Sequence, residues 1–251
     1  MNIEWNAQKY TNDFSFVHQY GNNVLELISA EKGSNILDLG CGNGALTNEL
    51  TQRGFHAVGL DASSDLLEIA RENYPHISFV EGDATDFSMQ EQFDAIFSNA
   101  VFHWIDKEKQ LDMMKCVYNA LRSGGEFVFE FGGYGNNQKI HDALCDEFDK
   151  VGLLYKNPFF FPTIGEYAAL LEQAGFKVIY ATLFDRFTEL KGDNGLKEWI
   201  LMFLKKPFED VVVDKERIID NAVDQLRPEL YQNGKWYADY VRLRMKAIKI
   251  K

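Results

Sequence analysis

A glycine-rich turn is the first feature of this sequence that can bind a ligand. Residues 36–44 read Ile-Leu-Asp-Leu-Gly-Cys-Gly-Asn-Gly, so an apolar run with one aspartate leads into three glycines spaced two apart. This pattern is typical of a buried strand that ends in a turn whose backbone approaches a ligand closely. Leu46 and Leu50 then have helical spacing, which completes the strand, turn and helix that open nucleotide-binding α/β domains.

The turn by itself fits two classes of cofactor. Gly40, Gly42 and Ala45 satisfy the dinucleotide pattern, which permits Ala at its third small position. Asp61 stands about where that fingerprint places its ribose-binding acid. A nicotinamide-dependent oxidoreductase is therefore one interpretation of the turn, and other residues must decide.

Two further carboxylates favour a cationic ligand. Asp38 stands two residues before the first glycine, where it would repel a pyrophosphate but can accept a hydrogen bond from an ammonium group. Asp83 follows the third predicted strand, where it can meet an adenine amino group. Together with Asp61, these side chains favour S-adenosylmethionine, which combines an ammonium group, a ribose diol, an adenine and a positive sulfonium.

The sequence also resembles the class I S-adenosylmethionine-dependent methyltransferases over about residues 33–131. The matching motifs, in chain order, are the first motif at 36–44, the acidic ribose position at Asp61, the adenine motif at 82–84, the fourth-strand motif at 93–99 and the Gly-Gly turn into strand five at 121–129. The resemblance implies S-adenosyl-L-methionine as methyl donor and S-adenosyl-L-homocysteine as product.

The resemblance also implies which residues hold this cofactor. The methionine end would be held by Asp38, Gly40, Cys41 and Gly42, the ribose by Asp61 and Ala62, and the adenine by Asp83 and Ala84, with Asn99 beside the sulfonium. Tyr10, which precedes the first helix, is a further candidate for cofactor contact. A non-catalytic cofactor-binding module on the same fold remains a second alternative.

A narrower likeness is to the trans-aconitate methyltransferase and methyltransferase type 11 group. It rests on residues 98–104, on Trp5 and Tyr10, and on the chain after the fifth strand. A tricarboxylate acceptor would need Arg or Lys in its pocket, and the candidates are Arg186 and Lys139. The acceptor is therefore expected to be a small molecule, with O-methylation of a carboxylate as one possibility.

His103 directly follows the fourth strand, at the sheet edge where ligands of such folds bind. It is the candidate general base or hydrogen-bond donor, and a purely structural role is the alternative. We expect direct in-line displacement, in which a carboxylate acceptor needs no base and a phenol or amine would need one. The candidate substrate wall comprises Trp5, His18, Trp104, Tyr134, Asn137, Phe160, Arg186 and Trp199. The alternative is core packing for Trp104, Tyr134, Asn137, Phe160 and Trp199, and packing of an N-terminal arm for Trp5.

The elements that must position these residues alternate between strands and helices. Strands separated by helices imply a parallel sheet with right-handed crossovers. The predicted strands are 35–39, 56–60, 77–80, 93–97, 126–131, 176–184 and 237–247, and the predicted helices are 44–53, 64–73, 107–121, a segment ending near 151, 165–174 and a helical region over 195–233.

These elements predict one α/β domain over residues 1–251, a Rossmann-like, doubly wound and mostly parallel seven-stranded sheet with an antiparallel last strand and a small helical cap. Its expected parts are an N-terminal helical lid at 1–32, a core at 33–189 and 234–251, and a cap insertion at 190–233.

The amino-acid composition limits the classes of partner that we expect this protein to bind. The formal charge of −12 argues against a nucleic-acid surface, and Arg242, Arg244 and Lys246 near the C-terminus alternate with apolar residues as one polar face of a strand would. Three cysteines without Cys-x-x-Cys spacing predict thiols and no metal site. The sequence shows neither a signal segment nor an apolar run of membrane length, so we expect a cytoplasmic protein that is a monomer or homodimer and does not bind membranes.

Overall fold

The computed structural model describes residues 16–209, 211 and 214–250, with side chains from residue 21 onward. Within this part of the chain one eight-stranded sheet has the order β3-β2-β1-β4-β5-β8-β6, and β7 pairs with β8. Its strands are β1 (Asn35–Leu39), β2 (His56–Asp61), β3 (Ser78–Glu81), β4 (Phe93–Asn99), β5 (Leu121–Gly132), β6 (Phe176–Leu190), β7 (Tyr231–Gln232) and β8 (Lys235–Lys249).

The first five strands pair in parallel, whereas β8 is antiparallel to both β5 and β6. This arrangement confirms the predicted Rossmann-like, mostly parallel sheet with an antiparallel last strand. The eighth strand, absent from the prediction, is the two-residue β7. In the described part of the chain no helix is long and apolar enough to cross a membrane.

Helices cover both faces of the sheet. They are α2 (Phe16–Leu25), α3 (Ala45–Gln52), α4 (Ser64–Asn73), α5 (Gln110–Ala120), α6 (Gln138–Lys150), α7 (Ile164–Gln173), α8 (Gly195–Phe203) and α9 (Lys215–Leu230), with short 3-10 turns η1 (Phe102–Trp104), η2 (Lys107–Lys109) and η3 (Lys206–Phe208). On β1, Ile36 packs with α2 and α3, while Leu37 packs on the other face with α5. The apolar run of β1 is therefore buried on both sides, as expected for a central parallel strand.

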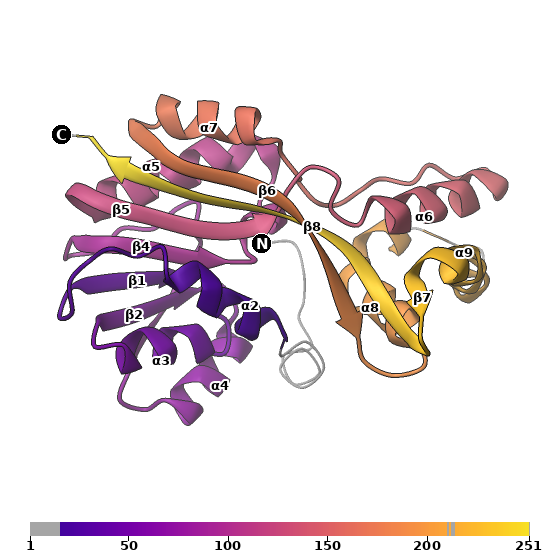
Figure 1. The fold of residues 1–251 in the computed structure, drawn as a ribbon, viewed down its shortest axis with the longest axis horizontal. Helices are drawn as coiled ribbons and strands as arrows, with labels where there is room; N and C mark the ends of the chain where they lie inside the picture. Colours follow the sequence, from indigo (N-terminus) through magenta and orange to yellow (C-terminus); the bar gives the residue numbers. More distant parts are fainter. Residues whose placement is uncertain (1–15, 210, 212–213, 251) are drawn as a thin grey trace.

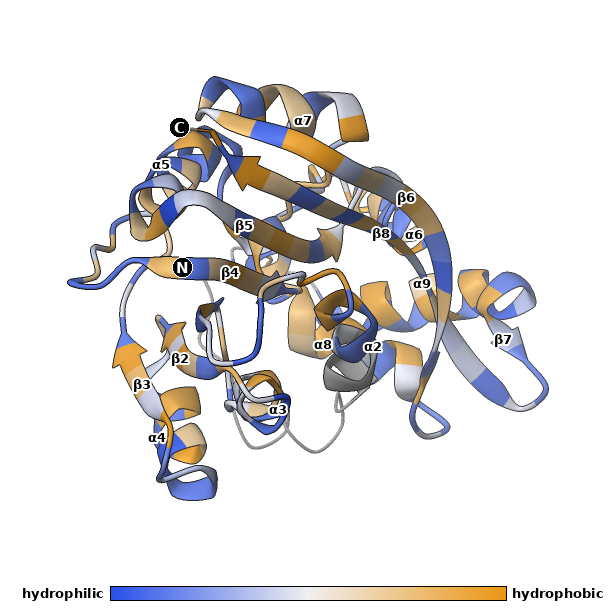
Figure 2. Ribbon diagram, turned by 60° about the vertical axis from the view of Figure 1, so that its left-hand side comes forward, coloured by the Kyte–Doolittle hydropathy of each residue, from blue (hydrophilic) through white to orange (hydrophobic). Residues whose placement is uncertain are grey.

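The last two long strands extend beyond their predicted ends. They pair from Phe176 opposite Lys249 to Leu190 opposite Trp236, with one register shift between Val178 and Tyr180. Figure 1 shows this two-stranded ladder running from the main sheet to a separate group of helices. The period-two pattern of the sequence is visible as alternating blue and orange along β8 in Figure 2.

That group of helices, which we call the helical unit, consists of α6, α8, η3 and α9. Its core joins Leu144 of α6, Trp199 of α8 and Leu226 of α9 to Trp236 and Tyr240 of β8. The sequence placed α8 and α9 in a cap over 190–233 and assigned α6 to the sheet core. In the structure α6 packs against α9 instead, and Asn221 Nδ2 of α9 donates a hydrogen bond to the buried Glu147 of α6 at 2.8 Å.

Candidate active site

Two neighbouring pockets lie at the carboxyl ends of the parallel strands, and Trp104 lines both of them. The first pocket is formed by the ends of β1, β2 and β3 and by residues 101–109. The second pocket lies where the β6–β8 ladder leaves the main sheet for the helical unit. Ligands of open α/β sheets bind at this edge, so both pockets stand where chemistry is expected.

The glycine turn forms the floor of the first pocket. Gly40 has a φ of 79°, which favours glycine, and a Cβ atom there would stand 2.2 Å from the Val101 side chain. Gly42 also has a positive φ, of 54°, but a Cβ atom there would meet only Leu66, at 4.0 Å. Close packing therefore requires a glycine at position 40, whereas the space that a Cβ atom would occupy at position 42 is open.

Asp61 ends β2 and organises this turn. Its Oδ2 accepts a hydrogen bond from the backbone N–H of Gly42 at 2.8 Å, and its Oδ1 accepts one from Ser63 at 2.8 Å. Burial raises the pKa of the carboxyl, and the same backbone hydrogen bonds oppose that effect. Each oxygen of an ionised carboxylate has a further lone pair, so Asp61 can accept additional hydrogen bonds from a ligand in the pocket.

The end of β3 adds a second carboxylate to the first pocket. Asp83 lines it together with Ala84, and its Oδ1 accepts hydrogen bonds from the backbone N–H and hydroxyl of Thr85, both at 2.8 Å. Five of the residues predicted to bind cofactor therefore lie in one pocket, namely Gly40, Asp61, Ala62, Asp83 and Ala84.

Four other predicted cofactor residues do not line this pocket, namely Asp38, Cys41, Gly42 and Asn99, and the fifth, Tyr10, lies outside the described residues. Asp38 is buried beneath the turn, where its Oδ2 accepts a hydrogen bond from Thr47 Oγ1 at 2.7 Å. Burial raises the pKa of this carboxyl to about 7, partly offset by the Thr47 hydrogen bond. The side chain of Cys41 packs in the core with Phe79, and burial raises the pKa of its thiol. Asn99 ends β4.

The second pocket combines an aromatic wall with several polar groups. Its lining comprises Ala100, His103, Trp104, Asn136, Asn137, Phe159, Phe161, Trp199, Phe203, Tyr240 and Arg242. These residues come from the end of β4, the start of α6, the connector before α7, helix α8 and strand β8. Such a mixture of large apolar surface and a few convergent polar groups is typical of small-molecule sites.

His103 is buried in this wall. Its Nδ1 accepts a long hydrogen bond of 3.4 Å from the backbone N–H of Gly132, and its ring stacks on Phe131 at 6.4 Å between centroids. Burial, and then the positive charge of Arg242, hold the pKa of His103 well below 6.5. The imidazole is therefore neutral at pH 7, and its Nε2 carries the proton when Nδ1 accepts.

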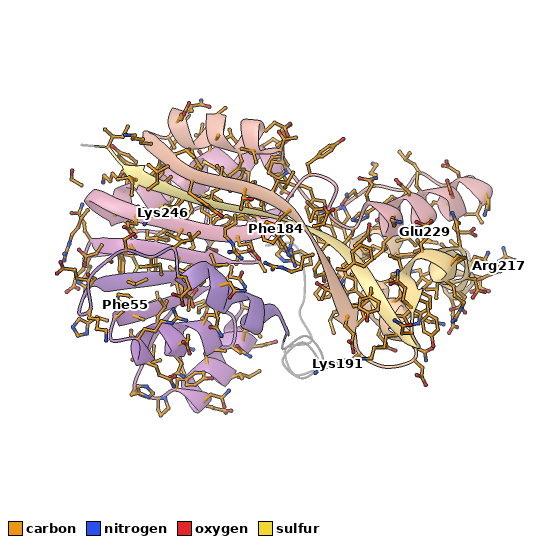
Figure 3. All side chains as sticks on the ribbon, viewed as in Figure 1. Phe55, Phe184, Lys191, Arg217, Glu229 and Lys246 are labelled. Atoms are coloured by element: carbon orange, nitrogen blue, oxygen red, sulfur yellow. The ribbon has the colours of Figure 1, made fainter. Side chains whose placement is uncertain are left out.

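Arg242 is a site residue that the sequence analysis missed. Its side chain is 7% exposed and stacks over the Tyr240 ring, with 4.2 Å from Cζ to the centroid. Tyr240 in turn accepts a hydrogen bond from Trp199 Nε1 at 2.7 Å. Trp199, which the sequence predicted in the substrate wall, also lines the pocket. Across the ladder Arg242 pairs with Phe184, which Figure 3 labels where β6 leaves the main sheet.

The two basic residues predicted to meet an acidic acceptor are not in the second pocket. Arg186 places its two Nη atoms 2.5 and 3.1 Å from the carboxylate oxygens of Glu130. Lys139 pairs with Glu229 on α9. Each of these cations instead faces a carboxylate that is distant in the sequence.

The remaining wall predictions divide between residues inside and outside the pocket. Asn137 and Trp104 line it, but Tyr134 does not, and its side chain is 64% exposed. Phe160 faces Lys107 at 5.7 Å, and its neighbours on either side line the pocket instead, because side chains of an extended connector point alternately to opposite sides. Trp5 and Tyr10 lie outside the described residues, as does the side chain of His18, whose backbone lies in α2.

Comparison with known proteins places this geometry in a family. A family model described as a methyltransferase domain matches residues 36–125. An uncharacterised methyltransferase of Schizosaccharomyces pombe is 33% identical over 257 aligned positions that cover 98% of each chain. A trans-aconitate 2-methyltransferase of Rhizobium leguminosarum bv. trifolii is 32% identical over 125 positions, covering 49% of this chain and 48% of that one.

Solved structures share the fold at low sequence identity. A methyltransferase of Bacillus halodurans superposes with a TM-score of 0.66 and 15% identity over 93% of this chain and 100% of that one. Phosphoethanolamine N-methyltransferase 2 of Haemonchus contortus, solved with S-adenosylhomocysteine, gives a TM-score of 0.59 and 16% identity over 93% of this chain and 53% of that one. The glycine turn, the carboxylates at successive strand ends and these relatives agree: the chain belongs to the class I S-adenosylmethionine-dependent methyltransferases, enzymes that take their methyl group from S-adenosylmethionine.

Proposed function

We propose that this methyltransferase transfers a methyl group to a carboxylate oxygen of a small molecule. In this proposal the cofactor occupies the first pocket and the acceptor the second. The observation that carries the proposal is the buried guanidinium of Arg242 in the wall of the second pocket. A guanidinium pairs bidentately with a carboxylate, and it does so most strongly where water is excluded.

The residues of the first pocket suit the cofactor. Asp61 would accept from the ribose hydroxyls and Asp83 from the adenine amino group, because both carboxylates line the pocket. Ala62 and Ala84 would flank these groups. The methionine end would lie over the turn at Gly40, with Asp38, Cys41, Gly42 and Asn99 around it. When bound, the cofactor supplies an electrophilic methyl group on a positively charged sulfur.

The second pocket suits an anionic acceptor better than a cationic one. The charge of Arg242 already disfavours the protonated form of His103, and it would disfavour an ammonium group in the same way. A carboxylate is ionised near neutral pH, so it can attack without a general base. His103 would then act by donating a hydrogen bond from Nε2 to the acceptor, and the rings of Trp104 and Phe159 would exclude water.

The names of related enzymes agree with this class of acceptor. Besides the trans-aconitate 2-methyltransferase, the relatives include a malonyl-[acyl-carrier protein] O-methyltransferase of Priestia megaterium, 32% identical over 122 positions that cover 47% of this chain and 44% of that one. Both names describe acceptors that bear carboxyl groups. The buried Arg242 in the wall of the second pocket supports the same preference in this chain.

The test uses radiolabelled S-adenosylmethionine and a small-molecule extract. A methyl ester releases labelled methanol in alkali, whereas N-methyl and C-methyl products do not. We expect alkali-labile product, and we expect Arg242→Gln to lower kcat/KM by about 100-fold while S-adenosylhomocysteine binding is retained. Arg227→Gln is the matched control, because Arg227 stacks on Tyr231 at 4.9 Å, away from both pockets. Alkali-stable product, or full activity in Arg242→Gln, would contradict the proposal.

A further inference from the structure

Three buried polar atoms gather where α6 begins. Among the described residues, Asn137 Oδ1, His141 Nε2 and Asp239 Oδ1 are buried side-chain atoms without a hydrogen-bond partner. Asn137 directly precedes α6 and His141 lies in its first turn, where the backbone N–H of His141 donates a hydrogen bond to the carbonyl oxygen of Asn137 at 3.0 Å. Asp239 O accepts a hydrogen bond from Asn137 N at 2.9 Å, and its Oδ2 accepts one from Lys139 N, also at 2.9 Å. Buried polar atoms without partners are costly, so a cluster of them points to a missing partner.

Of these three residues, Asn137 lines the second pocket and the other two do not. Its side chain is 2% exposed, and its backbone has a φ of 55° at the start of α6. The neighbouring Asn136 is satisfied, because its Oδ1 accepts from the backbone N–H of Val241 at 2.9 Å. Asn137 is therefore the residue of this cluster that a ligand in the second pocket can contact.

We infer that the methyl acceptor is a hydroxycarboxylic acid, whose carboxylate binds Arg242 and whose hydroxyl group donates a hydrogen bond to Asn137 Oδ1. The inference rests on the proposed function, because it places the acceptor carboxylate in the second pocket. Asn137 Oδ1 is an acceptor, so the ligand group opposite it must be a donor. The positive charge of Arg242 on the same wall favours a neutral hydroxyl over an ammonium group as that donor.

The two contacts also fix the orientation of the acceptor. Arg242 lies on β8 and Asn137 at the start of α6, so the carboxylate and hydroxyl contact separate elements of the same wall. The aromatic rings of Phe159 and Phe161 supply the apolar contact between acceptor and connector. An acid without the hydroxyl would leave Asn137 Oδ1 buried and unpaired, and this penalty is the physical basis of the selectivity.

The test compares acids that differ by one hydroxyl group. Wild-type protein saturated with S-adenosylhomocysteine is titrated calorimetrically with 3-phenyllactate, 3-hydroxy-3-phenylpropionate and 3-phenylpropionate, and with malate and succinate. We expect at least one hydroxy acid to bind about tenfold more tightly than its parent. Asn137→Gly removes the carboxamide and suits the positive φ, so it should abolish that preference. Asn137→Asp keeps an acceptor oxygen and should retain it.

Each outcome decides something. Equal binding of hydroxy acid and parent by the wild type would overturn the inference and leave the proposed function intact, since water would then satisfy Asn137 Oδ1. A preference that persists in Asn137→Gly would overturn it as well. Binding of none of the acids would overturn the proposed carboxylate pocket, and the inference would fall with it. Unchanged S-adenosylhomocysteine affinity in both variants shows that they are folded.

Discussion

Asp38 offers the sharpest test of the electrostatics beneath the cofactor turn. Its carboxyl group is 1% exposed and is held by the hydroxyl of Thr47 at 2.7 Å. Burial raises its pKa from 3.8 to about 7. Asparagine has nearly the same shape, and its carbonyl oxygen can accept the same hydrogen bond. Asp38→Asn therefore removes the ionisation while preserving the packing.

The sign of the effect follows from proton binding. Between pH 3.8 and about 7 the native Asp38 carboxyl keeps its proton while the unfolded chain loses it, so wild-type stability falls as pH rises. The rise in the pKa of Asp38 from 3.8 to about 7 corresponds to about 4 kcal/mol of unfolding free energy, because one pKa unit is worth about 1.4 kcal/mol. We expect Asp38→Asn to match the wild type near pH 4 and to exceed its free energy of unfolding by up to about 4 kcal/mol at pH 8.

Urea unfolding of the cofactor-free protein at pH 4, 6 and 8 measures this difference. Asp112→Asn is the control, because Asp112 is an exposed carboxylate that pairs with Lys115 at 3.1 Å, and such pairs contribute about 0 to 1 kcal/mol. The control should show the pH dependence of the wild type. If the gap between Asp38→Asn and wild type were the same at all three pH values, the reasoning from a buried ionisable group would be refuted.

Three further predictions concern the turn and the second pocket. Gly40→Ala should lose about 3 kcal/mol of stability in urea unfolding, because its Cβ would stand 2.2 Å from Val101, whereas Gly124→Ala, with a positive φ but no atom within 4 Å, should lose about 1 kcal/mol. Equal losses would contradict the packing argument. Tyr240→Phe should cost about 1–3 kcal/mol in the same assay, since it leaves the buried indole N–H that Tyr240 accepts unpaired, and an unchanged midpoint would count against that bond. Because the pKa of His103 lies well below 6.5, His103→Asn should leave the shape of the pH profile of kcat between pH 6 and 8 unchanged at saturating cofactor and should lose at most about tenfold in kcat; a loss of about 10²-fold or more would identify a general base.

The sequence predicted the cofactor half of the fold well, because its signals are local. The apolar run, the glycines and the helical spacing around residues 36–53 lie within one strand, turn and helix, and the structure places β1 and α3 there. Asp61 and Asp83 were found in the same way, since Asp61 ends β2 and Asp83 lies two residues after β3. The carboxyl ends of parallel strands meet at one edge of the sheet, so strand assignment alone brought these side chains together.

The acceptor half depended on contacts between distant segments. Arg186 and Glu130 are 56 residues apart, and the side chains of Asn136 and Lys139 contact segments about 90 to 105 residues away. No local pattern reveals whether a cation already has a carboxylate opposite it. The sequence therefore nominated Arg186, whereas the structure places Arg242 in the pocket.

By itself, then, the sequence determined the methyl-donor class, because the strand, the glycine turn and the acids proposed to bind the cofactor are each encoded within a few residues. Only the tertiary structure decided the acceptor wall. The register of β8 between β5 and β6 and the packing of α6 in the helical unit bring Arg242 and Asn137 to the wall of one pocket. Strand register and helix docking are set by side chains far apart in the chain, so periodicity could predict a polar face on the last strand but not what that face would meet.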